Sequence, residues 1–526
     1  MSSARSSFTL HEPEVEEQAS TSKLSTGLKP VLAPKYLKET PTTSCPTLPL
    51  AEAPDDWFFD PRNPRNWPKS KKWLTTAIVA LYMFVAPLSS STMAPGEAQI
   101  AARYSITNES ILAMTLSIFL LSFGIGPLFL APVSVLHIGN GFSVLFHLGC
   151  AFAPNTATLI GFRFLAGLSG SAPVACGGAV VSDLFNERER ASAMALYSLG
   201  PLLGPVLGPI AGGFIAQEVG VQYVYFMLAG TTTFAGLVGV PFLRETYAPL
   251  IKLRIAAATN DVEKTALQQA LSANNDIKSC RNIWGQLAFL CSNFSRPVYL
   301  LTHSFICFTL SLYMAFLYGC YYLFFVTFNG FFTKTYGFST GIASLMYTGL
   351  GAGFVFAACT GAKFSNILYL HLADKNGGKG EPEMRIPPIF VGSFFVPIGL
   401  LWYGWSAAYK LHWIMPVIGS SLFGMGLIVN ANVRPQNRPL TIDSLPIQLY
   451  LVDSFRYAAS ALSAAFLFRS LLGFSFPLFG YEIFAKLGYG WGFSMLGILA
   501  ICLGIPFPVF IYYKGAAIRA RSDLNH

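Results

Sequence analysis

The uncharged stretch SLGPLLGPVLGPIAGGF, residues 198–214, indicates the fold class of this chain. Glycines recur in it at four-residue spacing, at Gly204, Gly208 and Gly212. In a helix within a lipid bilayer, this spacing lines one face with glycine and lets a neighbouring backbone approach closely. Pro205 and Pro209 remove backbone donors and bend such a helix. The stretch therefore predicts a bent, closely packed membrane helix.

The composition of the whole chain favours the same class. Of its 526 residues, 53% are hydrophobic and only 12% are charged, whereas a soluble domain has about 25% charged residues. A soluble fold of this length needs more charge to cover its surface, but lipid tails solvate apolar side chains directly. We therefore expect an all-α protein that crosses the bilayer several times.

Apolar segments long enough to cross a bilayer, about 20 residues each, occur as six, a polar gap and six more. They lie at 73–94, 111–136, 138–155, 157–182, 190–216, 220–243, 301–328, 339–362, 386–407, 412–452, 457–480 and 490–513. The predicted parts are a disordered cytosolic tail at 1–72, an N-terminal six-helix bundle at 73–243, a cytosolic central loop at 244–296, a C-terminal six-helix bundle at 297–514 and a cytosolic tail at 515–526.

The Lys and Arg residues predict the orientation. Most of them lie before the first span, in the central loop and in the other loops of one side, whereas the opposite loops hold only Arg103, Lys334, Lys410 and Lys486. The positive-inside rule then puts both termini in the cytoplasm. The net charge of +9 is a topology signal. Nucleic-acid binding is disfavoured, because the basic residues are dispersed among the spans.

Other sequence signals add smaller expectations. The start of the chain has no signal-peptide pattern, so the first span is expected to act as the targeting signal. The nine cysteines are scattered and predict neither a disulfide framework nor a metal cluster. Asn108 and Asn293 begin glycosylation sequons. We expect Asn108 to stay unmodified, because it lies beside a span, and Asn293 to be cytosolic.

A few charged residues lie within or beside spans. Arg163 near the outer end of span 4 either snorkels to the interface or faces the interior, where it would tune a proton site or bind substrate. Asp183 ends the same span, and Asp453 ends span 10, where it either joins the interior or lies at the cytoplasmic surface. Arg469 lies within span 11.

Several motifs together resemble one family. Gly204, Gly208, Pro209, Gly212 and Gly213 fit GxxxGPxxGG, which resembles the antiporter motif of proton-coupled efflux pumps in the major facilitator superfamily. The element RFxxGxxG beginning at Arg163 and the segments DPRNPRNW (60–67), LRETYAP (243–249) and RYAASA (456–461) are similar to that superfamily as well. The combination resembles its fungal twelve-span drug:proton antiporters, which include multidrug, polyamine and secondary-metabolite efflux transporters.

The resemblance implies a major facilitator fold whose two bundles rock about a central cavity lined by spans 1, 4, 7 and 10. It implies a small-molecule substrate, the proton gradient as energy source, no cofactor, no metal and a plasma-membrane location, and we expect a monomer. Tyr313 and Tyr318, with Tyr321 and Tyr322, either stack on flat or cationic substrates or form aromatic packing. Asp183 fits a cytoplasmic gating salt bridge better than proton transfer.

The chain departs from this family in two places. Between spans 2 and 3 the basic loop GxxxDxxGRR is missing. The 44 residues from Ile111 to Pro154 leave only a turn near His137–Asn140, because two crossings need roughly 40. Residues 429–444 interrupt span 10 with two Arg, one Asp and two Pro. This segment is a bulge, a re-entrant loop or a retained intron, and the smooth junction of its flanks favours the last.

These observations predict a proton-coupled transporter that exports small amphiphilic molecules by alternating access. One alternative is a polyamine or other small-molecule carrier of the same fold. Another is a transport-impaired product, because of the missing loop and the interrupted span. An enzyme is disfavoured, since the sequence has no metal-ligand cluster, phosphate loop or nucleophile motif.

Overall fold

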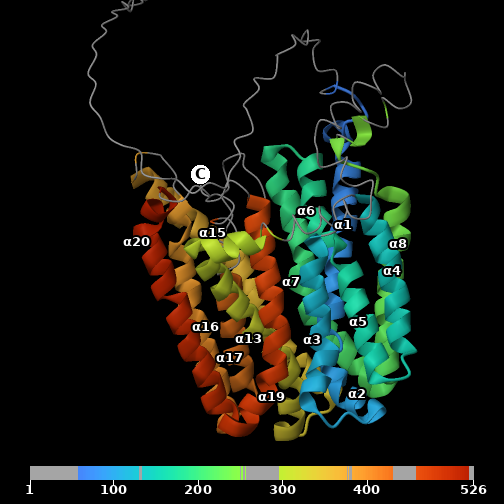
Figure 1. The fold of residues 1–526 in the computed structure, drawn as a ribbon, viewed down its shortest axis with the longest axis vertical. Coiled ribbons are helices and arrows are strands. Elements are labelled where there is room, and N and C mark those ends of the chain that lie inside the picture. Colours follow the sequence, from blue (N-terminus) through green and yellow to red (C-terminus); the bar gives the residue numbers. More distant parts are fainter. Residues whose placement is uncertain are drawn as a thin grey trace, which may run out of the picture. The chain divides into compact units, whose positions relative to one another are not determined.

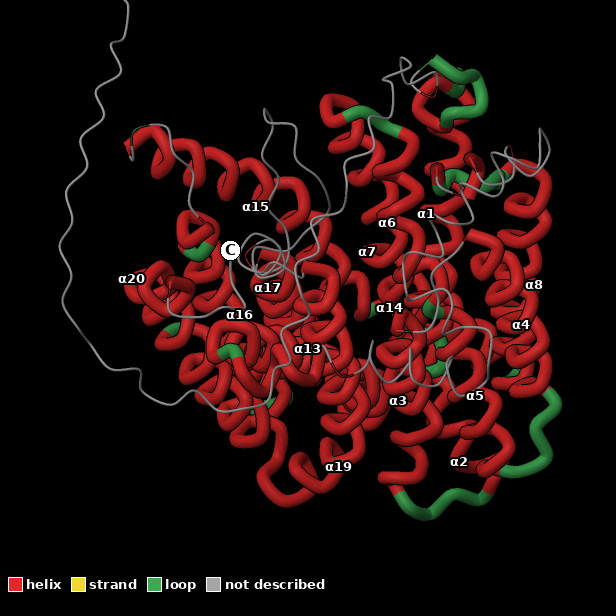
Figure 2. The backbone as a smooth tube through the Cα atoms, turned by 45° about the horizontal axis from the view of Figure 1, so that its top comes forward, coloured by secondary structure: helices red, strands yellow, loops and turns green. Residues whose placement is uncertain are grey.

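The computed structural model describes residues 57, 59–128, 133–248, 250–252, 255, 295, 297–375, 377, 382–429, 450 and 458–520. Every regular element in these ranges is a helix (Figures 1 and 2), so the predicted all-α class is confirmed. Most of the predicted tails and of the central loop lies outside the described residues. Below, the first half means residues 57–248 and the second half means residues 295–520.

The first half is built from eight α-helices and three short 3-10 turns among its described residues. The helices are α1 (Lys69–Ser91), α2 (Glu97–Tyr104), α3 (Glu109–Ile125), α4 (Val133–Ala151), α5 (Thr156–Gly170), α6 (Ala172–Leu184), α7 (Glu187–Glu218) and α8 (Val221–Phe242). The 3-10 turns are η2 (Pro64–Asn66), η3 (Ala94–Gly96) and η4 (Gly126–Leu128). Helix α1 packs along α7, and α4 packs along α5 and α8.

The second half continues with longer helices. They are α13 (Phe305–Tyr336), α14 (Thr340–Leu345), α15 (Tyr347–Lys375), α16 (Pro387–Ala408), α17 (Ile414–Val429), α19 (Ala458–Gly504) and α20 (Pro506–Ala520), with the 3-10 turn η6 at Pro382–Arg385. Helix α13 packs along α19, and α16 packs along α17 and α19. The halves meet where α3 lies beside α19 and where α7 contacts α14 and α15 (Figure 1).

Helix α19 reverses direction at Gly488. This residue has φ 69°, a left-handed conformation that glycine adopts without steric cost. Phe484 and Phe493, on either side of it, stack with ring centroids 4.7 Å apart. The element therefore consists of two antiparallel arms, which correspond to the predicted spans 457–480 and 490–513.

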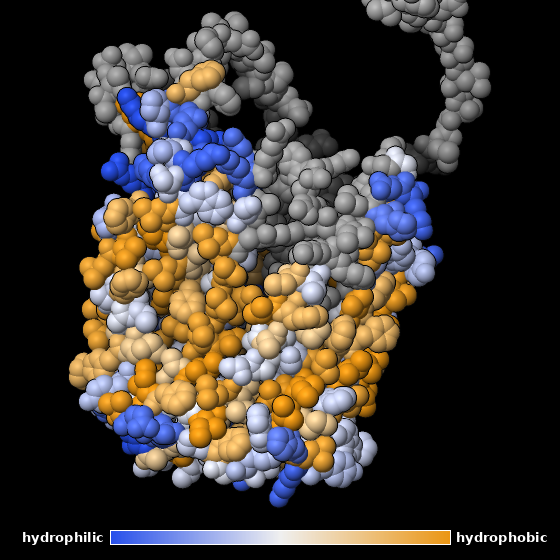
Figure 3. Space-filling view, turned by 180° about the vertical axis from the view of Figure 1, so that it is seen from behind, coloured by the Kyte–Doolittle hydropathy of each residue, from blue (hydrophilic) through white to orange (hydrophobic). Residues whose placement is uncertain are grey.

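The helices carry an apolar surface at mid-height. Eight helical segments of the described residues are long and apolar enough to cross a membrane, and one of them, Ala461–Gly515, includes both arms of α19. Large apolar side chains such as Leu237 and Phe394 point outward, with 71% and 58% of their surface exposed. Figure 3 shows this apolar zone between hydrophilic patches at the two ends. The pattern fits a membrane-spanning protein, and the count of twelve crossings stays a prediction.

The turn expected near His137–Asn140 was predicted wrongly. Helix α4 begins at Val133 and runs through these residues without a break. They serve as packing positions: Asn140 Nδ2 donates to the carbonyl oxygen of Thr232 at 3.0 Å, and the Tyr82 hydroxyl lies 3.2 Å from His137 Nδ1. The connection between spans 2 and 3 therefore precedes Val133, and residues 129–132 lie outside the described residues. Most of the predicted insertion, 430–444, lies outside them too.

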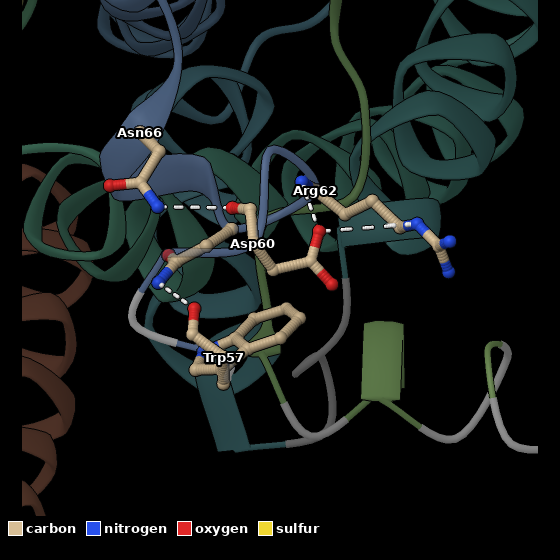
Figure 4. A network of polar contacts seen from close by, with 5 residues as sticks. Trp57, Asp60, Arg62 and Asn66 are labelled. Atoms are coloured by element: carbon tan, nitrogen blue, oxygen red, sulfur yellow. Dashed lines mark hydrogen bonds and ion pairs between the residues drawn. The ribbon is translucent and has the colours of Figure 1, made fainter. Parts of the chain in front are cut away.

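The segment DPRNPRNW forms a folded turn before α1 (Figure 4). Asn63 Nδ2 donates to the carbonyl oxygen of Trp57, and Asn66 Nδ2 donates to that of Asp60, both at 3.0 Å. The backbone N–H of Arg62 donates to Asp60 Oδ1 at 2.7 Å. These side-chain-to-backbone bonds hold the turn together ahead of α1, which begins after Pro68.

Candidate functional site between the two halves

The glycines of α7 lie against the backbone of α1. A Cβ atom at Gly204 would be only 2.9 Å from both the Leu88 nitrogen and the Phe84 oxygen, and one at Gly208 would be 2.6 Å from Ser91 Oγ. Gly212 meets Thr92 in the same way. Because a larger residue at any of these positions would force the helices apart, the four-residue spacing forms a close seam between α7 and α1.

The end of this seam reaches the second half. Gly213 contacts Ser344 of α14, and a Cβ there would also lie 3.2 Å from the Thr340 oxygen. The backbone N–H of Gly341 donates to Gln217 Oε1 at 2.8 Å. Pro209 is buried within α7. Helix α7 thus touches α1 along its length and the other half of the protein at its end.

We call the end at which α1 begins, at Lys69, the near face, and the opposite end, beyond Ser91, the far face. Toward the far face a buried carboxylate joins the halves. Glu97 is 6% exposed, and its Oε2 accepts a hydrogen bond from the Tyr481 hydroxyl of α19 at 2.9 Å. Its Oε1 has no hydrogen-bond partner among the residues that the structure describes. Close by, Ser110 Oγ donates to the carbonyl oxygen of Leu478 at 3.2 Å.

Glu97 was missed in the sequence analysis. The predicted first span ends at residue 94, so hydropathy assigned Glu97 to a loop. In the structure, η3 and α2 continue from α1, so Lys69–Tyr104 forms one helical run of 36 residues around an apolar stretch. The available signal was an acidic residue three positions beyond the predicted end of an apolar segment, in the sequence Ala94-Pro-Gly-Glu97.

Arg163 lies in the interior of the first half rather than at the interface. Its side chain is completely buried, and it donates to the carbonyl oxygens of Ser89 at 3.0 Å, Thr115 at 3.1 Å and Leu116 at 3.4 Å. Its guanidinium carbon lies 5.3 Å from the Phe119 ring centroid. Arg163 therefore ties α5 to α1 and α3 through backbone acceptors.

The tyrosines of α13 point in different directions. Tyr313 is fully buried within the second half, where its hydroxyl lies 2.9 Å from Ser393 Oγ. Tyr322 instead reaches the first half, with its hydroxyl 2.9 Å from Ser90 Oγ. The ring centroid of Tyr318 lies 5.3 Å from that of Tyr322 and 4.3 Å from the guanidinium carbon of Arg469. The structure thus brings Ser90, Tyr318, Tyr322 and Arg469 together where the halves meet.

The remaining candidates lie elsewhere. Asp183, at the near face, accepts a hydrogen bond from the Thr246 hydroxyl of its own half at 3.3 Å. Asp453 lies outside the described residues. Asn108 Oδ1 caps α3, accepting from the backbone N–H groups of Ser110 at 2.9 Å and Ile111 at 3.3 Å. Within the described part of the chain, no three His, Cys, Asp or Glu side chains are placed to hold a metal ion.

Comparisons with known proteins agree with this architecture. The family model described as Major Facilitator Superfamily matches residues 79–477. Similar proteins include "Efflux pump radE" of Floropilus chiversii, 38% identical over 471 residues that cover 88% of this chain and 83% of that protein. They also include "MFS transporter cpaT" of Aspergillus oryzae, 39% identical over 476 residues that cover 88% and 90%. "MFS-type transporter penM" of Penicillium rubens is 39% identical over 489 residues that cover 90% of each.

Solved structures show the same fold at low sequence identity. The partially occluded, inward-open xylose transporter XylE from E. coli is 14% identical with a TM-score of 0.54, covering 84% of this chain and 99% of that one. The proton:xylose symporter XylE bound to 6-bromo-6-deoxy-D-glucose is 14% identical with a TM-score of 0.57, covering 85% and 96%.

Proposed function

The chain belongs to the major facilitator superfamily, and from that premise we propose that it exports small amphiphilic molecules from the cytoplasm in exchange for protons. The seam between α7 and α1 is the observation that carries this proposal. Because α7 packs on α1 through glycine and also touches α14, a change in its bend alters contacts within one half and between the halves. Relatives that bear the name efflux pump support the direction of transport.

The contacts between the halves support entry of the substrate from the near face. Glu97–Tyr481, Ser110–Leu478 and Gly341–Gln217 hold the halves together toward the far face. The charge asymmetry of the loops assigns the near face to the cytoplasm. We place the protein in the plasma membrane, with both termini cytoplasmic and each protomer acting alone. Cargo of the drug, toxin or secondary-metabolite kind suits such a route.

Glu97 is the group at which we propose that a proton acts. Its carboxylate lies between the halves and accepts from Tyr481, and its other oxygen has no partner in the described part of the chain. A proton taken up there removes the charge from a contact that joins the halves. An intramembrane carboxylate of this kind is a common element of proton relays in transporters. Arg163, bound to three carbonyl oxygens, is assigned a structural role beside it.

Accumulation of two dyes in yeast cells tests the proposal. The chain is expressed in a strain that lacks its own efflux pumps, and the cells are loaded with fluorescein or rhodamine 123. We expect expression to lower the accumulation of at least one dye, and a protonophore to abolish the difference. Export that persists after the proton gradient has collapsed contradicts proton coupling, and increased accumulation identifies an importer. If expression changes the accumulation of neither dye and does not change that of spermidine, the export proposal fails.

A further inference from the structure

Arg469 has no counter-ion among the described residues. It lies in α19, within the segment Ala461–Gly515 that is long and apolar enough to cross a membrane. None of the ion pairs in the described part of the chain includes Arg469, and its Nε has no hydrogen-bond partner. A charge within such a segment is costly and is usually found where it serves a transport pathway.

Arg163 and Arg190 are buried and bound to backbone carbonyls, whereas Arg469 is partly exposed. Arg163 donates to three carbonyl oxygens, and Arg190 donates to those of Ser182 and Phe185. Arg469 instead lies against two aromatic rings, 4.3 Å from the Tyr318 centroid and 4.5 Å from that of Phe466. Such stacking holds the guanidinium plane in one orientation and leaves its N–H groups available for a bidentate acceptor.

The surroundings of Arg469 complete an aromatic surface at the junction of the halves. Tyr318 and Tyr322 lie side by side, and Tyr322 is joined to Ser90 of the first half. Gly473, one turn beyond Arg469, has no side chain, and a Cβ there would lie 3.4 Å from Tyr318 Cδ1 and 3.5 Å from Leu120 Cδ1. These are ordinary van der Waals distances, so α13 and α3 both lie against α19 next to the charge.

We propose that Arg469, Tyr318, Tyr322 and Ser90 bind a flat aromatic anion, a carboxylate or phenolate, as the cargo. The anion acts as the counter-ion that Arg469 lacks among the described residues, through charge-assisted hydrogen bonds. Its ring stacks on the partly exposed Tyr318, and Tyr322 and Ser90, whose hydroxyls lie 2.9 Å apart, form the wall behind it that joins the two halves. Cationic cargo, one of the expectations from the tyrosines alone, is repelled by Arg469. The assignment rests on the proposed function, because it names the substrate class of that transporter.

Binding of two matched dyes to the purified full-length chain tests this assignment. Fluorescein and rhodamine 123 share one flat ring system, but fluorescein is anionic and rhodamine 123 is cationic. Fluorescence polarisation is expected to show fluorescein binding at least about tenfold more tightly, the size of one hydrogen bond to a charged group. Arg469→Gln is expected to remove that preference. Arg469→Lys retains part of it, because an ammonium keeps the charge but not the planar fork.

Two further variants separate binding from folding. Arg103→Gln removes an exposed arginine at the far face and is expected to bind both dyes like the unchanged chain. Tyr318→Leu keeps an apolar side chain beside Arg469 and is expected to weaken fluorescein binding several-fold without loss of the preference for the anion. It serves as the second measurement if Arg469→Gln has a lowered unfolding temperature.

The outcomes distinguish this site from the proposed function. Equal fluorescein binding before and after Arg469→Gln in a folded chain overturns the assignment, as does a preference for rhodamine 123. If fluorescein binding depends on Arg469 but cells export neither dye, the binding site is supported and the efflux proposal is rejected. Export of rhodamine 123 by a chain that does not bind fluorescein keeps efflux and rejects the site.

Discussion

Glu97 and Tyr481 come from opposite halves of the chain, and the tyrosine hydroxyl donates to the glutamate carboxylate at 2.9 Å. The same hydroxyl lies 3.3 Å from the carbonyl oxygen of Val326 in α13. One side chain of α19 is therefore positioned by its own half and by the other. Protonation of Glu97 in the first half therefore changes a contact on which the packing of both halves depends.

Removal of the Tyr481 hydroxyl is expected to let the two halves separate more readily at the far face. Tyr481→Phe loses a hydrogen bond to a charged group, worth about 1.5–3 kcal/mol, which corresponds to a shift of about tenfold or more between two conformations. Spin labels at Ser105 and Lys410, both exposed at the far face, measure the separation of the halves. The exposed Cys359 and Cys502 are first replaced by Ala, as are Cys45, Cys280 and Cys291, which lie outside the described residues. An unchanged distance distribution would show that this bond does not hold the far face closed.

Substitution of the α7 glycines is expected to destabilise the protein. Gly204→Ala brings a Cβ to 2.9 Å from the α1 backbone, and overpacking of this kind costs about 1–3 kcal/mol. Gly230 of α8 is the matched control, because a Cβ there meets nothing within 4 Å. Gly230→Ala is expected to be neutral or to gain up to about 1 kcal/mol from helix propensity. Thermal unfolding of the two purified variants measures these effects. Equal unfolding temperatures for Gly204→Ala and Gly230→Ala would contradict close packing of α7 on α1.

Arg163 is expected to contribute to stability rather than to substrate choice. Arg163→Gln removes the hydrogen bonds of a buried guanidinium to the carbonyl oxygens of Ser89, Thr115 and Leu116, and a hydrogen bond to a charged group is worth about 1.5–3 kcal/mol. The unfolding temperature should fall, and affinity for fluorescein and for rhodamine 123 should fall together. A stable variant that loses only the pH dependence of export places Arg163 in the proton pathway instead.

Asn108 is expected to cap α3 without carrying a glycan. Its side chain accepts from two backbone N–H groups, so Asn108→Ala should cost about 1 kcal/mol, whereas Asn108→Asp keeps the acceptor. Treatment of the yeast-expressed chain with an endoglycosidase should leave its mobility unchanged. A mobility shift that Asn108→Asp abolishes would establish modification at this site.

The sequence predicts these elements unevenly, for physical reasons. Apolar length locates most helices, but it does not locate their ends. Glu97 was missed because a turn of 3-10 helix carries the backbone past the apolar segment without a break. The turn near His137 was misplaced because the arithmetic assumed crossings of about 20 residues, whereas α3 is only 17 residues long.

Side-chain direction is a second limit of the sequence. Tyr313 and Tyr318 lie on the same helix, five residues apart, which at about 100° per residue puts them on different faces. The sequence does not say which face meets the other half. In the structure Tyr313 points to Ser393 within its own half, whereas Tyr318 points to Arg469. The charge beside Tyr318 depends on the packing of α13 against α19, which no local pattern predicts.

The most direct test of proton-coupled export uses the purified chain in liposomes with the near face outward. The lumen is made acidic relative to the bath, and uptake of the exported dye is followed together with lumenal pH. Proton-coupled export predicts dye uptake accompanied by alkalinisation of the lumen. Dye uptake and alkalinisation should both be lost in Glu97→Gln. Both should be retained in Glu109→Gln, which replaces an exposed carboxylate of the same face. Dye uptake of equal rate without a pH difference, or in Glu97→Gln, would contradict it.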